Sequence, residues 1–235
     1  GAASFTAELG SVLPAVLALA QARGNSGRDA FVAYIAGVEI AHRMSMATPR
    51  RSGWFHSSAV GIFGAAAACA RLIGLDANRI DDALGIALSM SAGTKQAIVE
   101  RTLTKRLQTA FAARNGLQAA LLAECGITGP LGWLDGPYGW MAQYEAGDLA
   151  ILEQGLGRDF AFTATGIKKY PCCLCSHAAL DAAFGLMREE NIAASDVSAA
   201  HVTISPYASR IVGAPFEPGN DPQVAAQFSV QYVVA

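Results

Sequence analysis

The sequence predicts a mainly α-helical protein with a large helical domain over residues 1–157 and a partial, smaller α+β domain over residues 158–235. Hydrophobic residues make up 52% of the 235 residues and charged residues only 15%, which is typical of a globular chain with a sizeable core. Apolar residues recur at helical spacing through the first half. Helical and alternating patterns are mixed in the last third, which indicates α+β structure.

Two helices are expected in the first 75 residues. Ser26 and Asp29 have the spacing of a capping box, and apolar residues then follow one helical face; these are Phe31, Tyr34, Ile35 and Val38. Ser57 or Ser58 is expected to cap the next helix. Gly74 should end it in the left-handed conformation that glycine adopts easily.

Two more helices complete the first domain. Asp76 opens the first of them, and a second spans roughly residues 107–124 and ends at Gly126 by its periodicity. Between Gly126 and Gly157 the chain is rich in glycine, proline and aromatic residues, which predicts tight turns around buried rings.

The region after residue 158 mixes alternating, strand-like patterns with helical ones. Residues 160–167 alternate loosely, residues 178–188 have helical periodicity, and residues 201–205 alternate as a half-buried strand does. The last residues, AAQFSVQYVVA, form an apolar pattern that is not followed by a capping or polar residue. One strand cannot form a sheet by itself, so we expect this domain to be incomplete within the 235 residues.

Composition and charge exclude several classes of function. The formal net charge of -2 gives no field that attracts nucleic acid or an anionic membrane, so we expect neither as a partner. No apolar stretch was expected to span a bilayer, and the first residues lack the pattern of a signal peptide. The five cysteines therefore predict a reduced, cytoplasmic protein rather than a disulfide framework.

Reactive residues are concentrated between Thr165 and His177, and three interpretations are open. A metal site would use Cys172, Cys175 and His177, but a second ligand pair is missing. A redox pair would use the same two cysteines at a helix start, without the strand-helix-strand context typical of such proteins. A substrate site would use Lys168, held by the following Tyr-Pro at a domain boundary where small ligands bind.

Motifs along most of the chain favour the substrate interpretation. The run T-G-x-K-x-Y-P-C-C-x-x-x-H, together with WFHSSAVGIFGAAAACARLIGLD, TLTKRLQTAFAARNGLQAALLAECGITGP, LDGPYGWM and AAQFSVQYVVA, resembles the MmgE/PrpD family in family order. Its members include 2-methylcitrate dehydratase, cis-aconitate decarboxylase and iminodisuccinate epimerase. The resemblance implies a homodimer in which a large helical domain is followed by a smaller α+β lid, with the active site between them.

The resemblance also implies a chemistry and a set of site residues. His56, Lys105 and Lys168 match the family's active-site histidine and two lysines. Such enzymes act without a cofactor or metal on small di- and tricarboxylates, by moving a proton beside a carboxylate or losing carboxylate. Preorganised cations stabilise the negative charge that forms. We expect either lysine as the base, His56 as the acid, and an activity most like that of 2-methylcitrate dehydratase.

Two departures from the family pattern leave an alternative open. Family members usually carry an acidic D-x-D-D-type segment ahead of the first matched helix, but here Ser4 is followed directly by Phe5. Gln108 stands where the family often has histidine. A non-catalytic dimeric scaffold of the same fold is therefore the second hypothesis. His56 would then only cap a helix, and Lys105 and Lys168 would be solvated surface charges. A thiol or metal protein that uses Cys172 and Cys175 is the third hypothesis.

Overall fold

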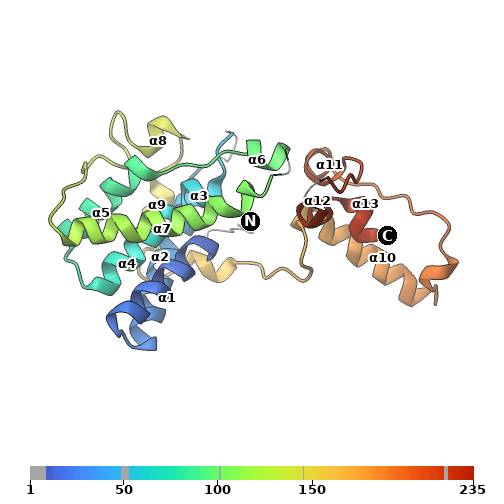
Figure 1. Cartoon of the computed structure of the whole chain (residues 1–235), viewed down its shortest axis with the longest axis horizontal. Helices are drawn as coiled ribbons and strands as arrows, with labels where there is room; N and C mark the ends of the chain where they lie inside the picture. The colour runs from blue at the N-terminus through green and yellow to red at the C-terminus, as the bar shows by residue number, and fades with distance from the viewer. Residues whose placement is uncertain (1–8, 49–52, 101, 145, 220–221) are drawn as a thin grey trace. The chain divides into compact units, whose positions relative to one another are not determined.

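The computed structural model describes residues 9–48, 53–100, 102–144, 146–219 and 222–235, which fold mainly into helices (Figure 1). The chain divides into two compact units. The first comprises the described residues up to Val99 together with those of Thr104–Gly166, and the second comprises the described residues of Glu100–Leu103 and Ile167–Ala235. A boundary at residue 158 stays a prediction.

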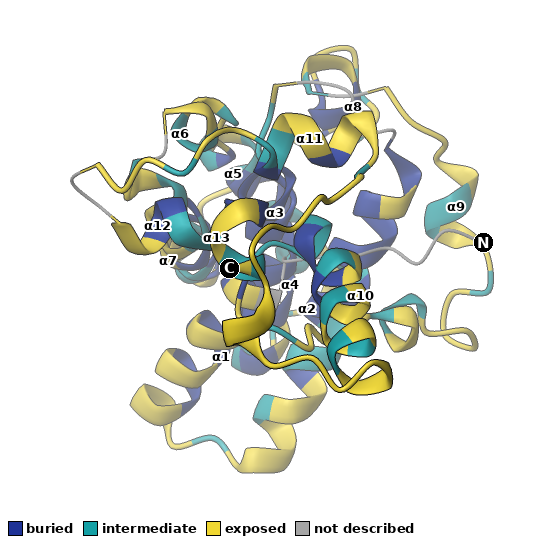
Figure 2. Ribbon diagram, turned by 90° about the vertical axis from the view of Figure 1, so that its right-hand side faces the viewer, coloured by how far each residue is buried: buried dark blue, intermediate teal, exposed yellow. Residues whose placement is uncertain are grey.

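The first unit is a bundle arranged around one apolar helix. Its helices are α1 (Leu9–Arg23), α2 (Gly27–Ala47), α3 (His56–Ala59), α4 (Gly61–Ile73), α5 (Ala77–Met90), α6 (Gln96–Val99), α7 (Thr104–Glu124), α8 (Trp140–Gln143), α9 (Ala150–Glu153) and the 3-10 helix η1 (Ala161–Ala164). Helix α4 contacts α1, α2, α5 and α7, and it is buried along almost its whole length (Figure 2). This helix is the centre of the core.

Glycine and alanine allow the helices around α4 to approach closely. A Cβ atom on Gly37 of α2 would collide with the carbonyl oxygen of Gly64, and one on Gly64 would lie 2.6 Å from the Gly37 oxygen. On the α7 side, a Cβ on Gly116 would lie 2.6 Å from the Ala65 Cβ and 2.7 Å from the Ile62 oxygen. The bundle therefore packs backbone against backbone, which only residues without a side chain permit.

Local signals predicted most helix ends correctly. The Ser26 side chain accepts a hydrogen bond from the Asp29 amide and Asp76 does the same for Arg79, so both expected N-caps are confirmed. Gly74 ends α4 with φ at 88°, as expected. The face predicted for α2 was partly wrong, because Phe31 is 63% exposed and small residues occupy the contact with α4 instead.

The predicted serine cap before α4 is wrong. Helix α3 begins at His56, so Ser57 and Ser58 lie inside it and are buried, and no side chain caps it. The Ser58 hydroxyl donates instead to the carbonyl oxygen of Ala92, 2.5 Å away. One stretch, His56–Ile73, is long and apolar enough to cross a membrane, although none was expected from the sequence; 89% of it is buried inside the protein.

Aromatic rings hold the turn-rich segment after α7 against the core, as predicted. The Trp133 ring stacks on Phe63 of α4 with 5.2 Å between centroids. Trp140 is 1% exposed and lies parallel to Tyr144 at 5.6 Å. Buried rings thus fix this segment, whose described residues form only the short helices α8 and α9.

A buried ion pair on α2 holds the end of this segment. Arg43 Nε donates to Glu39 Oε1 across 2.6 Å, and both side chains are under 10% exposed. Arg43 also donates to three carbonyl oxygens, those of Leu152, Gln154 and Asp159. Glu39 accepts hydrogen bonds from two main-chain amides, those of Ala161 and Phe162. These bonds explain why two charges are stable in the interior.

The second unit consists of short helices. They are the 3-10 helices η2 (Leu174–Ser176) and η3 (Ala194–Asp196) and the α-helices α10 (His177–Glu189), α11 (Pro206–Val212), α12 (Pro222–Gln227) and α13 (Val230–Val234). The helix expected over residues 178–188 is confirmed as α10. Residues 201–205 are not a strand, because they pair with no neighbouring segment among the described residues. The α+β character expected of this region is therefore absent from the described part of the unit.

Candidate active site

His56 lies at the start of α3 in a largely buried position. Its side chain is 8% exposed, and its ring meets the Trp140 ring edge-on with 6.1 Å between centroids. The preceding residue, Phe55, donates its amide to the carbonyl oxygen of Gly93 across 2.9 Å. A short bridge between Trp54 and Thr94 extends this contact. His56 is thus positioned by the loop that follows α5.

That loop, residues 91–95, is anchored by three different segments of the first unit. Four successive carbonyl oxygens each accept a hydrogen bond from another part of the chain, namely Ser91 from the Tyr144 hydroxyl, Ala92 from Ser58, Gly93 from the Phe55 amide and Thr94 from Gln108. Gly93 has φ at 113°, a value that side chains disfavour. The loop is therefore a fixed platform beside His56.

Lys105 approaches the same place from α7. Its Nζ lies over the Phe55 ring, 5.8 Å from the centroid, within the range of a cation–π contact. Phe55 directly precedes His56. Of the three predicted site residues, His56 therefore belongs to the Phe55–His56 dipeptide of the first unit and Lys105 contacts it. Lys105 lies in the first turn of α7, which begins three residues earlier than predicted.

Gln108 is one helical turn beyond Lys105 and is 5% exposed. Its Nε2 donates to the Thr94 carbonyl oxygen across 3.1 Å. The sequence marked this position only as a departure from the family's histidine. Neither its burial nor the loop that it contacts could be read from the local pattern, because both depend on tertiary packing.

A hollow of about 540 Å³ opens beside this cluster. It is lined by residues on both sides of the bridge and by α6, namely Gly53, Trp54, Thr94, Lys95, Gln96 and Val99. Thr94 therefore separates the hollow from Gln108. A hollow of this size accommodates a small organic anion, and the amine of Lys95 supplies a further positive charge at its wall.

Lys168 belongs to the second unit. Its Nζ donates to the Cys172 carbonyl oxygen across 3.0 Å, so a tight turn holds its side chain. The next residue differs: Lys169 Nζ lies 2.6 Å from Asp181 Oδ1, and the hydrogen bond with this carboxylate raises the pKa of Lys169. Of the two adjacent lysines, Lys169 is thus neutralised by a carboxylate, whereas Lys168 donates to an uncharged oxygen.

The surroundings of the cysteines near Lys168 disfavour their thiolate forms. Burial raises the pKa of the Cys172 thiol. A hydrogen bond with the Cys173 side chain, followed by burial, raises that of Cys175. A raised pKa lowers the fraction of thiolate, which is the nucleophilic and metal-binding form. His177 begins α10, and its ring meets Tyr170 edge-on at 5.2 Å, consistent with the structural role expected for it.

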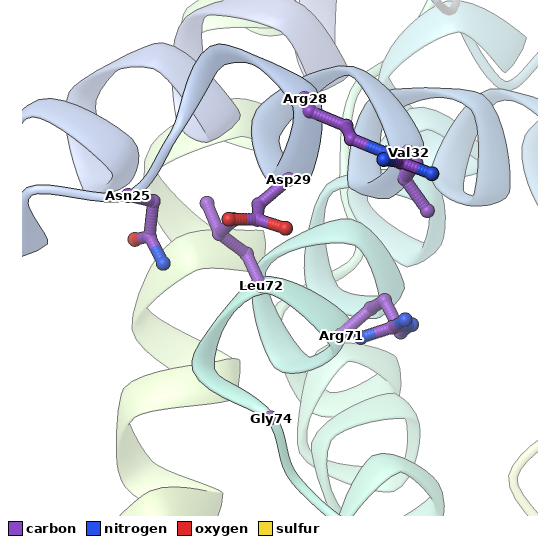
Figure 3. A pocket seen from close by; sticks show the side chains of 7 residues that line it. All are labelled: Asn25, Arg28, Asp29, Val32, Arg71, Leu72 and Gly74. Carbon is purple, nitrogen blue, oxygen red and sulfur yellow. The ribbon is translucent and has the colours of Figure 1, made fainter.

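A second cavity of the first unit, of about 320 Å³, lies between the start of α2 and the end of α4 (Figure 3). Arg28 and Arg71 line it together with Asn25 and Asp29. Arg28, Arg71 and Asp29 are all exposed, and none of the three predicted site residues is among those that line it. We therefore place the candidate site at His56 and Lys105.

The fold and this cluster define a helical protein in which a lysine lies over the ring next to a buried histidine, near a small hollow. The chain belongs to the MmgE/PrpD family, as the sequence indicated. It matches the MmgE/PrpD N-terminal domain over residues 3–151 and the MmgE/PrpD C-terminal domain over residues 170–235.

Cis-aconitate decarboxylases are among the curated proteins that the chain resembles. The protein of that name from Aspergillus terreus is 31% identical over an alignment of 255 residues, and this alignment covers 95% of this chain and 50% of the relative. The Homo sapiens protein is 33% identical over 187 residues, 74% of this chain and 38% of the relative. This chain thus spans about half the length of the first relative. Both relatives are named as decarboxylases, whereas the motifs led us to expect similarity to 2-methylcitrate dehydratase.

Proposed function

We propose that the protein is a cofactor-independent lyase that acts on small polycarboxylates, with His56, Lys105 and Lys168 as its active-site residues. Family membership supports the reaction class, and the names of the relatives support a substrate similar to cis-aconitate. The observation that carries the proposal is the position of Lys105 Nζ over the ring of Phe55, the residue next to His56.

The chemistry requires positive charge close to the reacting carbon. Removal of a proton beside a carboxylate, or loss of carboxylate as carbon dioxide, leaves an electron pair that spreads into the remaining carboxylate. A lysine ammonium group placed there stabilises this charge, and such preorganised groups contribute about 10²–10³ in rate. Lys105 and Lys168 are the proposed cations, and either can remove a proton when its amine is neutral.

His56 is the proposed proton donor. Decarboxylation needs a proton delivered to the delocalised carbanion that remains, and dehydration needs one delivered to the leaving hydroxyl group. Because the histidine is largely buried against Trp140, its proton is shielded from bulk water. An imidazole titrates near neutral pH and therefore suits either step.

Proton NMR in deuterated water tests the reaction class. We expect turnover, or exchange of a proton beside a carboxylate, with at least one of cis-aconitate, citrate, 2-methylcitrate and iminodisuccinate. Lys105→Met should lower the rate about 100-fold, whereas Arg114→Met, which removes an exposed cation from the same helix, should not. Absence of both turnover and exchange with all four compounds would reject the proposal. Assembly as a homodimer and a cytoplasmic location are further proposals.

Thermal melting separates this proposal from a non-catalytic scaffold of the same fold. A compound that binds the folded protein raises its Tm by an amount that grows with the ratio of its concentration to its Kd. An enzyme for polycarboxylates should therefore melt several degrees higher with a saturating substrate, while a scaffold should not respond.

A further inference from the structure

The cavity between the start of α2 and the end of α4 is lined by two arginines that have no partner. Arg28 belongs to α2 and Arg71 to α4 (Figure 3). Among the residues that the structure describes, neither guanidinium group forms an ion pair or a hydrogen bond. By contrast, the exposed Arg23 of α1 is paired with Glu124. Two unpaired like charges at one cavity repel each other, and a bound anion would relieve this repulsion.

The carboxylate that lines this cavity does not neutralise the arginines. Asp29 Oδ2 accepts a hydrogen bond from the Ser26 hydroxyl across 2.7 Å. Among the described residues, Asp29 forms an ion pair with neither Arg28 nor Arg71. One carboxylate beside two guanidinium groups leaves the described wall of the cavity with a positive balance, which favours an anion.

The first turn of α2 adds hydrogen-bond donors beside Arg28. Ser26 Oγ accepts from the Asp29 amide, and the Ser26 carbonyl oxygen accepts from the Ala30 amide. The amides of Gly27 and Arg28 have no acceptor among the described residues. They stand at the positive end of a helix of 21 residues, and such amides bind anions readily.

The other polar groups at the cavity also favour an anion. Asn25 lines it; its Oδ1 is buried, whereas its Nδ2 is not buried and has no acceptor among the described residues. The accessible end of this amide is therefore a donor. At the end of α4, the carbonyl oxygens of Ala70 and Arg71 already accept from the amides of Gly74 and Leu75, which limits the repulsion between this helix end and an anion.

We infer that this cavity binds a phosphate group, either free phosphate or the phosphate of a small monoester. A carboxylate has two oxygens, which suit a single guanidinium fork. A phosphate has at least three strong acceptor oxygens around a tetrahedral centre, so it can accept from donors on two helices. The volume of about 320 Å³ is at the small end of the range for ligand sites. Since none of the proposed active-site residues lines the cavity, the inference does not rest on the proposed function.

An NMR titration of the whole protein with inorganic phosphate tests the inference. The amide signals of Gly27 and Arg28 should shift and saturate, with a Kd of about 1 mM or below. The amide of Tyr207, in the first turn of α11 in the second unit, is the control and should not move. Absence of a saturable shift at Gly27 and Arg28 would overturn the inference, and this result does not depend on any variant.

Variants assign the binding to the two arginine side chains. Arg28→Met and Arg71→Met should each weaken phosphate binding at least about tenfold, as expected when a hydrogen bond between charged groups is lost. Arg71→Lys keeps the charge without the planar fork, so its loss should be smaller than that of Arg71→Met. The control Arg114→Met removes an exposed arginine of α7 that does not line the cavity and should bind phosphate normally. Unchanged binding in both Arg28→Met and Arg71→Met would contradict the inference.

Two further ligands identify the source of the anion. Tighter binding of glycerol 3-phosphate than of inorganic phosphate would indicate a monoester, and weaker or equal binding the free ion; either result supports a phosphate site. Citrate that shifts the Gly27 and Arg28 amides at lower concentration than phosphate would instead show a polycarboxylate site and overturn the choice of phosphate. Because these titrations need no turnover, failure of the proposed function would leave their result unaffected.

Discussion

Lys169 Nζ and Asp181 Oδ1 lie 2.6 Å apart, and this pair distinguishes two lysines that are adjacent in the sequence. The Tyr170 hydroxyl donates to the same carboxylate oxygen across 2.7 Å, and hydrogen bonds, first from Lys169 and then from Tyr170, lower the pKa of Asp181. The charge of Lys169 is balanced locally. That of Lys168, which donates to a carbonyl oxygen, is left to attract an anion.

The first prediction compares these two lysines. Lys168→Met should lower kcat/KM about 100-fold, because it removes a cation that stabilises the transition state. Lys169→Met should change it less than about fivefold, because the carboxylate of Asp181 already balances the charge of Lys169. Steady-state kinetics on the substrate found by NMR give both values. Equal losses in the two variants would show that the lysines act only as a general positive patch.

The second prediction concerns the buried pair on α2. Glu39→Leu leaves the Arg43 guanidinium buried without its carboxylate and should lower the free energy of unfolding by about 3–5 kcal/mol. Urea unfolding followed by tryptophan fluorescence reports on the first unit alone, because all three tryptophans, Trp54, Trp133 and Trp140, belong to it. The exposed pair of Arg23 and Glu124 provides the control: Arg23→Met should cost less than about 1 kcal/mol. Similar costs for both variants would contradict the prediction.

The third prediction tests the close packing around α4. Gly116→Ala should destabilise the first unit by about 1–3 kcal/mol, because the added methyl group overlaps Ala65 and Ile62. The matched change Gly10→Ala, at a helical glycine with no atom near its Cβ position, should stabilise the unit by about 0.4–1 kcal/mol. The same fluorescence measurement applies, and a neutral Gly116→Ala variant would mean that the helices separate easily.

The fourth prediction concerns thiol reactivity. Cys125 is exposed, while burial raises the pKa of Cys69 to about 12. At mildly alkaline pH, iodoacetamide should therefore modify Cys125 first, and Cys69 only after unfolding. Cys172 and Cys175, whose pKa values are also raised, should react more slowly than Cys125. Mass spectrometry of digested samples follows each site, and faster modification of Cys172 or Cys175 would restore the thiol hypothesis.

Sequence patterns predicted the helix ends well because capping depends on neighbouring residues. Ser26, Gly74 and Asp76 each act within their own turn, and all three were predicted correctly. Predictions failed where a distant contact decided the outcome. Ser58 was expected to cap a helix but instead donates to the Ala92 carbonyl oxygen. Residues 201–205 have a strand pattern, but no partner strand lies among the residues that the structure describes.

The candidate site was predictable only in part, for the same reason. Resemblance to a family identified His56 and Lys105, and the structure brings Lys105 to the residue beside His56. The relation of Lys168 to these two residues stays a prediction. Gln108 and the loop over residues 91–95 carried no local signal of function, since their importance comes from hydrogen bonds between segments that are distant in the sequence.

The way in which that loop is anchored has a consequence for natural variation. Tyr144, Gln108 and the neighbouring residues Phe55 and Ser58 come from three separate stretches of chain, yet they hold four consecutive carbonyl groups of one short segment. Replacement of the side chain of Tyr144, Ser58 or Gln108 removes one of these hydrogen bonds and loosens the segment that the others hold. Substitutions at these scattered positions should consequently be inherited as compensating sets, and a single exchange taken from a relative should be tolerated less well than the whole group exchanged together.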